Sequence, residues 1–142
     1  RAVHTGCDAE GMAAVIGELD TTPSGLIFAN LVDSDSKYGH RNDVAGYAAN
    51  LERIDHDLER LLPKLLDTDV LFVTADHGND PSTASTDHSR EYVPVLAAGR
   101  AVRAGTDIGT RATFADLGQT IADVFGIRPL AAGTSFLPQL VR

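Results

Sequence analysis

One amphipathic segment between two short apolar runs constrains the fold of this chain most. Over residues 44–65 apolar side chains recur at steps of three and four and charged side chains fill the other face, which predicts a helix. Asp43 is a good N-cap residue, and Pro63 should end or kink the helix. The flanking runs, residues 26–32 and 69–74, have the mostly apolar composition of strands buried on both faces of a sheet. Because a helical crossover joins parallel strands, the sequence predicts an α/β fold with a parallel sheet.

Three further segments carry weaker signals of secondary structure. Asp8 is placed to cap a short amphipathic helix near the start of the chain. Residues 92–99 resemble a third strand, which Pro94 pushes toward an edge or a bulge. Thr113 is placed to cap a last helix, and Gly126 is placed to stop it.

Length and composition limit the classes of protein to consider. At 142 residues the chain is long enough for one domain with a sizeable core, but not for two complete ones. A formal charge of -8 argues against nucleic acid as a partner and suits a protein that binds cations. No apolar run approaches the roughly 18 residues of a membrane span. Cys7 is the only cysteine, so we expect no internal disulfide, no thiolate zinc cluster and a reducing compartment, the cytoplasm.

Two polar segments follow the ends of the first two predicted strands. In an open parallel sheet the carboxyl ends of the strands meet at one edge, where ligands gather. Side chains that are far apart in sequence can therefore converge at this edge. A further side chain can reach it from the loop before the third predicted strand. The candidates are Asp35, His40, Asp76, His77 and His88.

The residue types in this set point to divalent metals. Mixed carboxylate and imidazole ligands suit zinc, manganese or iron, whereas calcium prefers oxygen ligands alone. Five ligands exceed the usual three of one catalytic ion, so two ions are expected, and such pairs promote phosphoryl transfer. Any one of these residues can instead be a helix cap or a turn former. That reading applies best to Asp33, Asp43, Asp80 and Asp87, although Asp33 or Asp80 could also orient a ligand.

Four stretches carry a resemblance to a known family. They are NLVDSDSKYGHRNDVAGY at 30–47, TADHGNDPSTASTDHSREYVPVL at 74–96, TFADLGQTIADVFG at 113–126 and GTSFL at 133–137. They closely resemble the carboxyl-terminal part of the phosphopentomutase family, within the alkaline phosphatase superfamily. The resemblance implies a three-layer sandwich around a parallel sheet, of which residues 1–142 are a single partial domain.

The resemblance also implies a site and an activity. Asp35, His40 and His88 match the ligands of one manganese ion, and Asp76 with His77 match part of the set for a second. In the family the two ions activate a phosphothreonine that exchanges a phosphoryl group with a pentose phosphate. Ribose 1-phosphate and ribose 5-phosphate are thereby interconverted, and deoxyribose phosphates are used similarly.

Other functions remain open at this stage. The cofactor-independent phosphoglycerate mutases also have an Asp-His pair after a strand. The spacing favours a pentomutase, since His40 lies five residues after Asp35 and His88 twelve after Asp76. A monoester phosphatase is a weaker alternative. The chain could also be a metal-binding module without catalysis, or a structural domain whose polar residues are caps and turns.

Part of the family's machinery has no match in this sequence. The threonine nucleophile and one aspartate ligand lie in the family's amino-terminal portion, and a cap domain is inserted between the halves of its core. We therefore expect a fragment without the amino-terminal core and the cap domain, in which residues 1–24 connect to the missing cap. Its exposed sheet edge would associate with the missing amino-terminal half. The hydroxyl side chains near the ligands are interpreted as structural; they are Thr74, Thr83, Ser85, Thr86 and Ser89.

Overall fold

The computed structural model describes residues 1–141 and divides the chain into two compact units. The first unit comprises Arg1–Leu65 and His77–Val93, and the second comprises Leu66–Asp76 and the chain from Pro94 onward. The expectation of a single partial domain stays a prediction. Within residues 1–141, no helix is both long enough and apolar enough to cross a membrane.

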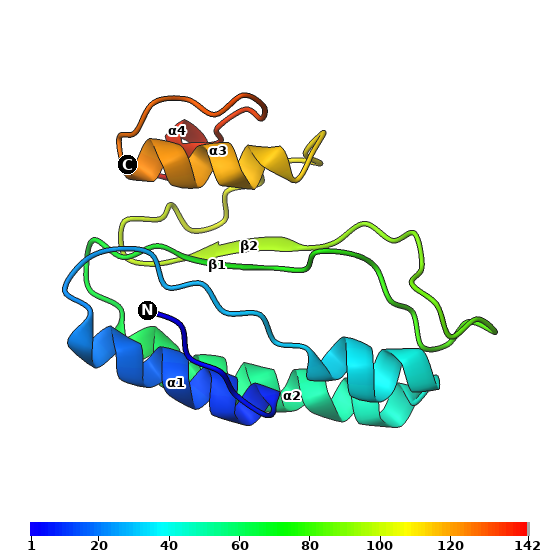
Figure 1. Ribbon diagram of the computed structural model, residues 1–142. Helices are drawn as coiled ribbons and strands as arrows, with labels where there is room; N and C mark the ends of the chain where they lie inside the picture. The colour runs from blue at the N-terminus through cyan, green and yellow to red at the C-terminus, as the bar shows by residue number, and fades with distance from the viewer. Residues whose placement is uncertain (142) are drawn as a thin grey trace. The chain divides into compact units, whose positions relative to one another are not determined.

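Two helices form the body of the first unit. Helix α1 (Asp8–Thr21) and helix α2 (Val44–Leu61) lie side by side (Figure 1). As predicted, Asp43 caps α2, because its carboxylate accepts a hydrogen bond of 2.9 Å from a backbone N–H of the first turn. The helix runs into the 3-10 turn η3 (Leu62–Lys64), where Pro63 ends it as expected.

The role predicted for Asp8 was wrong in detail. Cys7 holds the N-cap position of α1, and Asp8 is the first helical residue. The Asp8 carboxylate accepts hydrogen bonds from the backbone N–H of Asp33 at 3.0 Å and from Nδ2 of Asn50 at 2.9 Å. In return, the Asp8 N–H donates to Asp33 Oδ2 at 3.1 Å. Because these partners are distant in sequence, the carboxylate joins α1 to α2 and to the turn before η1 (Ser34–Tyr38) instead of capping its own helix.

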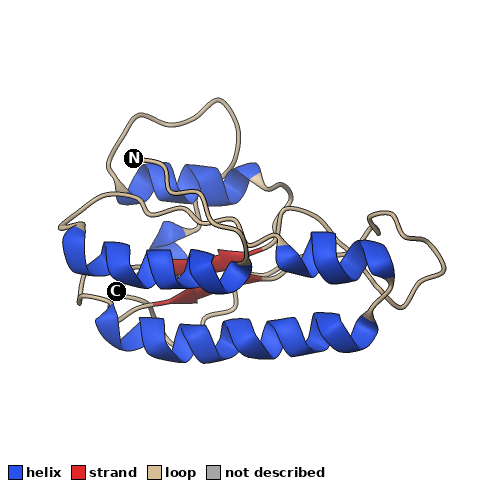
Figure 2. Ribbon diagram, turned by 60° about the horizontal axis from the view of Figure 1, so that its bottom comes forward, coloured by secondary structure: helices blue, strands red, loops and turns tan. Residues whose placement is uncertain are grey.

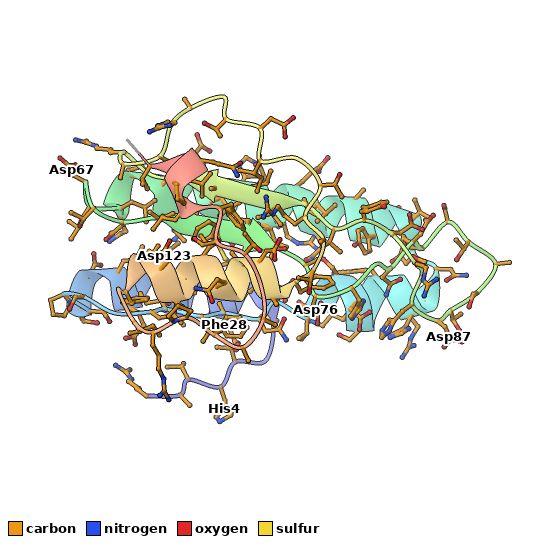
Figure 3. The ribbon with its side chains drawn as sticks, turned by 90° about the horizontal axis from the view of Figure 1, so that it is seen from above. His4, Phe28, Asp67, Asp76, Asp87 and Asp123 are labelled. Carbon is orange, nitrogen blue, oxygen red and sulfur yellow. The ribbon has the colours of Figure 1, made fainter. Side chains whose placement is uncertain are left out.

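The predicted first strand, residues 26–32, forms no strand in the part of the chain that the structure describes. Leu26, Phe28 and Val32 are exposed, and Phe28 has 84% of its surface accessible (Figure 3), whereas Ile27 and Leu31 are half-buried. A β-strand is defined by backbone hydrogen bonds to a neighbouring strand. The carbonyl of Val32 instead accepts the N–H of Ser36 at 2.9 Å and so begins the helical turn that follows. The predicted strand-helix-strand unit over residues 26–74 is therefore not formed.

The second unit contains the sheet. Strands β1 (Leu71–Thr74) and β2 (Val95–Ala98) lie within the two later predicted strands and pair with each other (Figure 2). The pairing is antiparallel, because the chain returns through a loop and not through a crossover helix. The α/β class is confirmed, with a two-stranded antiparallel sheet among the described residues. The parallel three-layer sandwich is not confirmed.

Two helices and one aromatic side chain complete the second unit. Helix α3 (Ala115–Val124) has Phe114 at its N-cap position, so the cap predicted at Thr113 was wrong by one residue, although the Thr113 hydroxyl accepts the N–H of Ala115 at 3.3 Å. Gly126, with a φ of 60°, follows its end as predicted. Phe136, just before α4 (Leu137–Leu140), is fully buried.

Hydrogen bonds to α3 hold the segment around Phe136. The Phe136 N–H donates to the hydroxyl of the buried Thr120 at 3.0 Å. Asp116 accepts the N–H of Thr134 at 2.8 Å and Nε of Arg111 at 3.0 Å. The hydrogen bond from Thr134 lowers the pKa of Asp116 below its usual 3.8; burial opposes this shift, and the Arg111 guanidinium adds to it.

Candidate metal centre

Asp35 and His40 lie on two successive short helical turns. Asp35 belongs to the π-helical turn η1, and His40 belongs to the 3-10 turn η2 (Gly39–Arg41). Asn42 ends this segment in the left-handed conformation, with a φ of 53°. Asparagine tolerates this conformation better than most residues. The local backbone thus presents a carboxylate and an imidazole from adjacent turns.

His88 reaches the same place from the loop of residues 77–93. Gly78 and Ser89 form an antiparallel bridge at the base of this loop. The Ser89 hydroxyl also accepts the backbone N–H of Asp80 at 2.8 Å. Farther along, Nδ2 of Asn42 donates to the carbonyl of Thr83 at 3.0 Å. The first two interactions close the loop on itself, and the bond from Asn42 holds it against the segment that carries Asp35 and His40.

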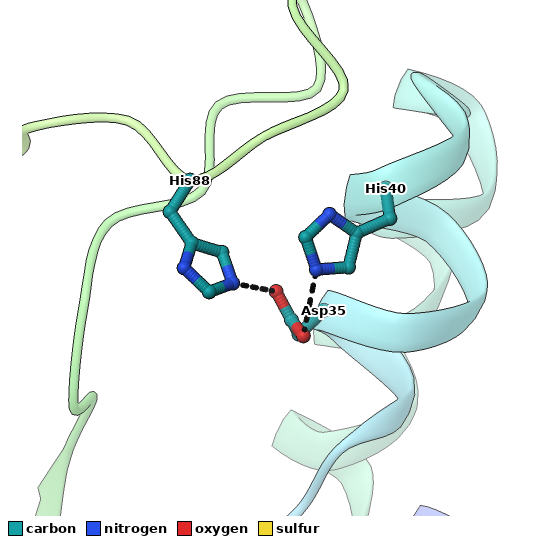
Figure 4. A group of neighbouring side chains, drawn as sticks. All are labelled: Asp35, His40 and His88. Atoms are coloured by element: carbon teal, nitrogen blue, oxygen red, sulfur yellow. Dashed lines mark ion pairs between the residues drawn. The ribbon is translucent and has the colours of Figure 1, made fainter.

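The three side chains meet around the Asp35 carboxylate (Figure 4). Nε2 of His40 lies 3.3 Å from Oδ2 of Asp35, and Nε2 of His88 lies 3.4 Å from Oδ1. One donor atom of each residue can be chosen so that all lie within 4.8 Å of one another. Two donors about 2.1 Å from one ion at a tetrahedral angle are about 3.4 Å apart. The observed separations therefore fit a single divalent ion.

The hydrogen bonds of His40 favour metal binding at Nε2. Its Nδ1 lies 2.5 Å from the carbonyl oxygen of Thr86, so Nδ1–H is the donor. In the neutral imidazole the lone pair of Nε2 then faces Asp35, an arrangement that a cation stabilises. Histidine ligands of metals commonly donate their other ring N–H to a carbonyl in this way.

His77 lies beside this cluster, and Asp76 belongs to the other compact unit. The His77 ring stacks on the His88 ring with centroids 3.8 Å apart, and its Nδ1 lies 3.2 Å from the carbonyl oxygen of Gly78. Asp76 is exposed and follows the end of β1 (Figure 3). That Asp76 and His77 bind a second ion stays a prediction.

Two neighbours of the cluster were missed from the sequence. Nδ2 of Asn79 donates to Oδ1 of Asp35 at 2.6 Å, and the carbonyl of Thr86 accepts from His40. Asn79 stands two residues after His77, so an amide among candidate ligands was the available signal. A backbone carbonyl leaves no signal in side-chain types.

Some of the aspartates that were expected to be caps or turn residues have such a role in the structure. Oδ1 of Asp80 accepts the Ser82 N–H at 2.9 Å and closes a turn. The Ser82 hydroxyl and N–H lower the pKa of the Asp80 carboxyl. Asp87 lies on the exposed part of the loop (Figure 3). Asp33 is buried, and Lys37 donates to its Oδ2 at 2.9 Å.

Two titratable side chains of the first unit have shifted pKa values. Burial raises the pKa of Tyr47, and the negative charges of Asp35 and Asp80 raise it further. Burial also raises the pKa of Asp33, but hydrogen bonds from Lys37 and the Asp8 backbone outweigh burial and lower that pKa overall. The Asp33 carboxyl is thus held in its charged form.

Comparisons with known proteins agree on one family. The family model described as the metalloenzyme superfamily matches residues 3–129. The phosphopentomutase of Clostridium novyi is 48% identical over 141 residues, which cover 99% of this chain and 36% of that protein. The phosphopentomutase of Anaeromyxobacter sp. strain K is 53% identical over 140 residues, again 99% of this chain and 36% of the relative.

The resemblance to phosphopentomutases seen in the sequence is therefore confirmed. It also holds for the phosphopentomutase of Thermotoga petrophila, which is 60% identical over 111 residues, 78% of this chain and 28% of that protein. The chain spans about a third of the length of the curated relatives it matches.

Proposed function

The chain belongs to the metalloenzyme superfamily, and from this premise we propose that it supplies most metal ligands of a phosphopentomutase. The proposed reaction interconverts ribose, or deoxyribose, 1-phosphate and 5-phosphate. Identities of about 50% to proteins with this name, over nearly the whole chain, support the proposal. The observation that carries it is the cluster of Asp35, His40 and His88.

Each residue of the cluster has a role in holding an ion. Asp35 would provide a carboxylate oxygen, and His40 and His88 would each provide Nε2. Asp76 and His77 would contribute to a second ion, and manganese is the metal proposed for both. Such a pair, when bound, polarises a phosphoryl oxygen and stabilises the leaving oxygen of an in-line displacement. Imidazole with carboxylate is a donor set that manganese accepts.

The rest of the site is proposed to come from additional chain. The threonine that carries the phosphoryl group and one aspartate ligand are expected there, as is the cap that grips the sugar phosphate. The same additional chain would complete the parallel three-layer sandwich. The exposed apolar side chains of residues 26–32 support this, because an unpaired strand presents such groups to a partner.

A metal-binding module without catalysis is the second candidate. The cluster of Asp35, His40 and His88 supports it as well, because these three donors could hold an ion without taking part in a reaction. The site would then bind metal but would not form a phosphoenzyme. A cytoplasmic location is expected for either function and stays a prediction.

Metal titration tests the site directly. Calorimetry with Mn²⁺ should show binding by the 142-residue chain, and Asp35→Ala and His88→Ala should weaken that binding at least 10-fold, because each removes a ligand. His56→Ala is the matched control, since His56 is a highly exposed histidine on α2 outside the cluster. Equal affinity in all four proteins would exclude the proposed site.

An activity assay separates the two candidates. Ribose 1-phosphate turnover is measured with this chain alone and with a supplied amino-terminal half of a relative. Turnover only in the mixture, lost in Asp35→Ala, supports the phosphomutase. Manganese binding without turnover in a mixture that forms a stable complex supports the module.

A further inference from the structure

Among the described residues, His40, His88 and Asn79 contact the Asp35 carboxylate, and Asn79 is not a proposed ligand. Oδ2 faces His40, whereas Oδ1 faces His88 and accepts a hydrogen bond of 2.6 Å from Nδ2 of Asn79. The two histidines would bond to the same ion as Asp35. Asn79 cannot offer a metal its Nδ2, because an amide nitrogen is a donor only. Its hydrogen bond can therefore persist when the ion is bound.

Gly39 leaves the space that the Asn79 side chain occupies. A Cβ added at Gly39 would lie 2.5 Å from Cγ of Asn79 and 2.7 Å from its Oδ1, closer than real Cβ atoms approach. The backbone does not require glycine here, since Gly39 has φ and ψ near -60°, which every L-residue adopts. Glycine also costs chain entropy in a helical turn. The close approach of Asn79 is the structural reason for a glycine beside His40.

We propose that Asn79 is a positioning residue for the metal ligand Asp35 and that Gly39 makes room for it. This inference rests on the proposed metal centre. The Nδ2–H bond to Oδ1 fixes the plane of the carboxylate, so that its free lone pairs point to the ion between His40 and His88. Partners of this kind orient metal ligands, and their loss commonly weakens metal affinity 10- to 100-fold.

A double-mutant cycle tests this arrangement. Asn79→Ala should weaken Mn²⁺ binding by the 142-residue chain about 10-fold or more. Gly39→Ala should have a similar effect, because the added methyl group displaces the amide. In the double variant the methyl group occupies the vacated space, so its affinity should equal that of Asn79→Ala alone.

Asn42→Gly is the control for a purely structural role of Asn79. The Asn42 side chain also holds the loop, through Thr83, but it does not contact Asp35. Glycine accepts the positive φ at this position. This variant should retain the manganese affinity of the wild type. An effect as large as that of Asn79→Ala would show that loop attachment alone sets the affinity, and would overturn the proposal.

Two further results would overturn it. One is wild-type affinity in Asn79→Ala. The other is additivity, in which Gly39→Ala weakens binding by the same factor with and without the Asn79 side chain. If Asn79→Ala does not fold, Asn79→Ser replaces it in the cycle, because the serine hydroxyl is too short to reach Asp35.

A readout without metal keeps this proposal distinct from the proposed function. In the metal-free chain, the NMR resonances of the Asn79 side-chain amide should shift in Asp35→Ala and in Gly39→Ala, but not in Asn42→Gly. Resonances that do not move would overturn the positioning role even if manganese binds. If the two variants show these shifts but the wild-type chain binds no manganese, the metal centre is overturned and the Asn79–Asp35 contact is still established.

Discussion

Replacement of Asp8 by alanine should destabilise the first unit strongly, although Asp8 is not a proposed ligand. Only 5% of the surface of Asp8 is exposed, and its carboxylate joins three segments. It accepts the backbone N–H of Asp33 and Nδ2 of Asn50, which are 6% and 3% exposed. Alanine removes the acceptor of two donors that belong to buried residues.

The two lost hydrogen bonds have different costs. The Asp33 N–H would be left as a buried donor without its acceptor, which costs about 1–3 kcal/mol. Asn50 still donates a hydrogen bond of 2.9 Å from its Nδ2 to the Ser34 hydroxyl. Loss of its bond to Asp8 should therefore cost about the net contribution of one hydrogen bond to stability, about 1 kcal/mol. We therefore expect Asp8→Ala to lower the free energy of unfolding by about 2–4 kcal/mol.

Urea unfolding followed by far-UV circular dichroism measures this loss. Asp20→Ala is the matched control, because Asp20 is an aspartate on the same helix that pairs with Lys64 at 2.6 Å but has a side chain 60% exposed. A surface ion pair of this kind contributes about 0–1 kcal/mol. If Asp8→Ala is no less stable than Asp20→Ala, the reasoning about buried donors is refuted.

Three more predictions concern the second unit and the metal. The pKa of Asp116 is lowered in the folded chain, so its hydrogen bonds stabilise the fold above pH 3.8, and this stability is lost as the pH falls through the lower folded pKa. Amide exchange at Thr134, which donates to Asp116, should therefore accelerate as the pH falls over that range. The acceleration should be smaller in Asp116→Asn. Thr120→Val keeps the shape but leaves the buried N–H of Phe136 without its acceptor, so urea unfolding should show a loss of about 1–3 kcal/mol, whereas an unchanged midpoint would contradict this. Manganese at 100 times its dissociation constant should raise the free energy of unfolding by about 2.7 kcal/mol, and EDTA should abolish the gain, unless unfolded chain binds the metal equally.

The helices were the most predictable part of the fold. The period of apolar residues and the cap at Asp43 located α2 to within a few residues, because both signals are local. The strands β1 and β2 were also found from short apolar runs. Their antiparallel pairing was not predicted, since strand direction depends on how the chain returns and not on the composition of each strand.

Residues 26–32 show the limit of composition most clearly. The apolar run predicted a buried strand, but burial and pairing both need a neighbour that the run itself does not specify. Among the described residues that neighbour is absent, and Phe28 is exposed. The same sequence can be a central strand in a longer protein and an unpaired segment here.

The candidate site was predictable in its donors but not in its geometry. Asp35, His40 and His88 were chosen for residue type and position, and the structure brings these three together. Residue type also selected Asp76 and His77; the His77 ring stacks on that of His88, and the assignment of these two residues to a second ion stays a prediction. Side-chain chemistry could thus nominate donors, but it could not give their distances or their hydrogen-bond partners.

The orientation of the donors depends on groups that bind no metal. The carbonyl oxygen of Thr86 orients His40, and the side-chain amide of Asn79 orients Asp35. The absence of a Cβ at Gly39 leaves the space that this amide occupies. A search of the sequence for metal-binding residue types does not find these groups, because every residue has a backbone carbonyl and glycine has no side chain. They become visible only when the loop of residues 77–93 is in place. If these contacts set the affinity for metal, then variants at Asn79 and Gly39 should change manganese binding while every ligand remains present.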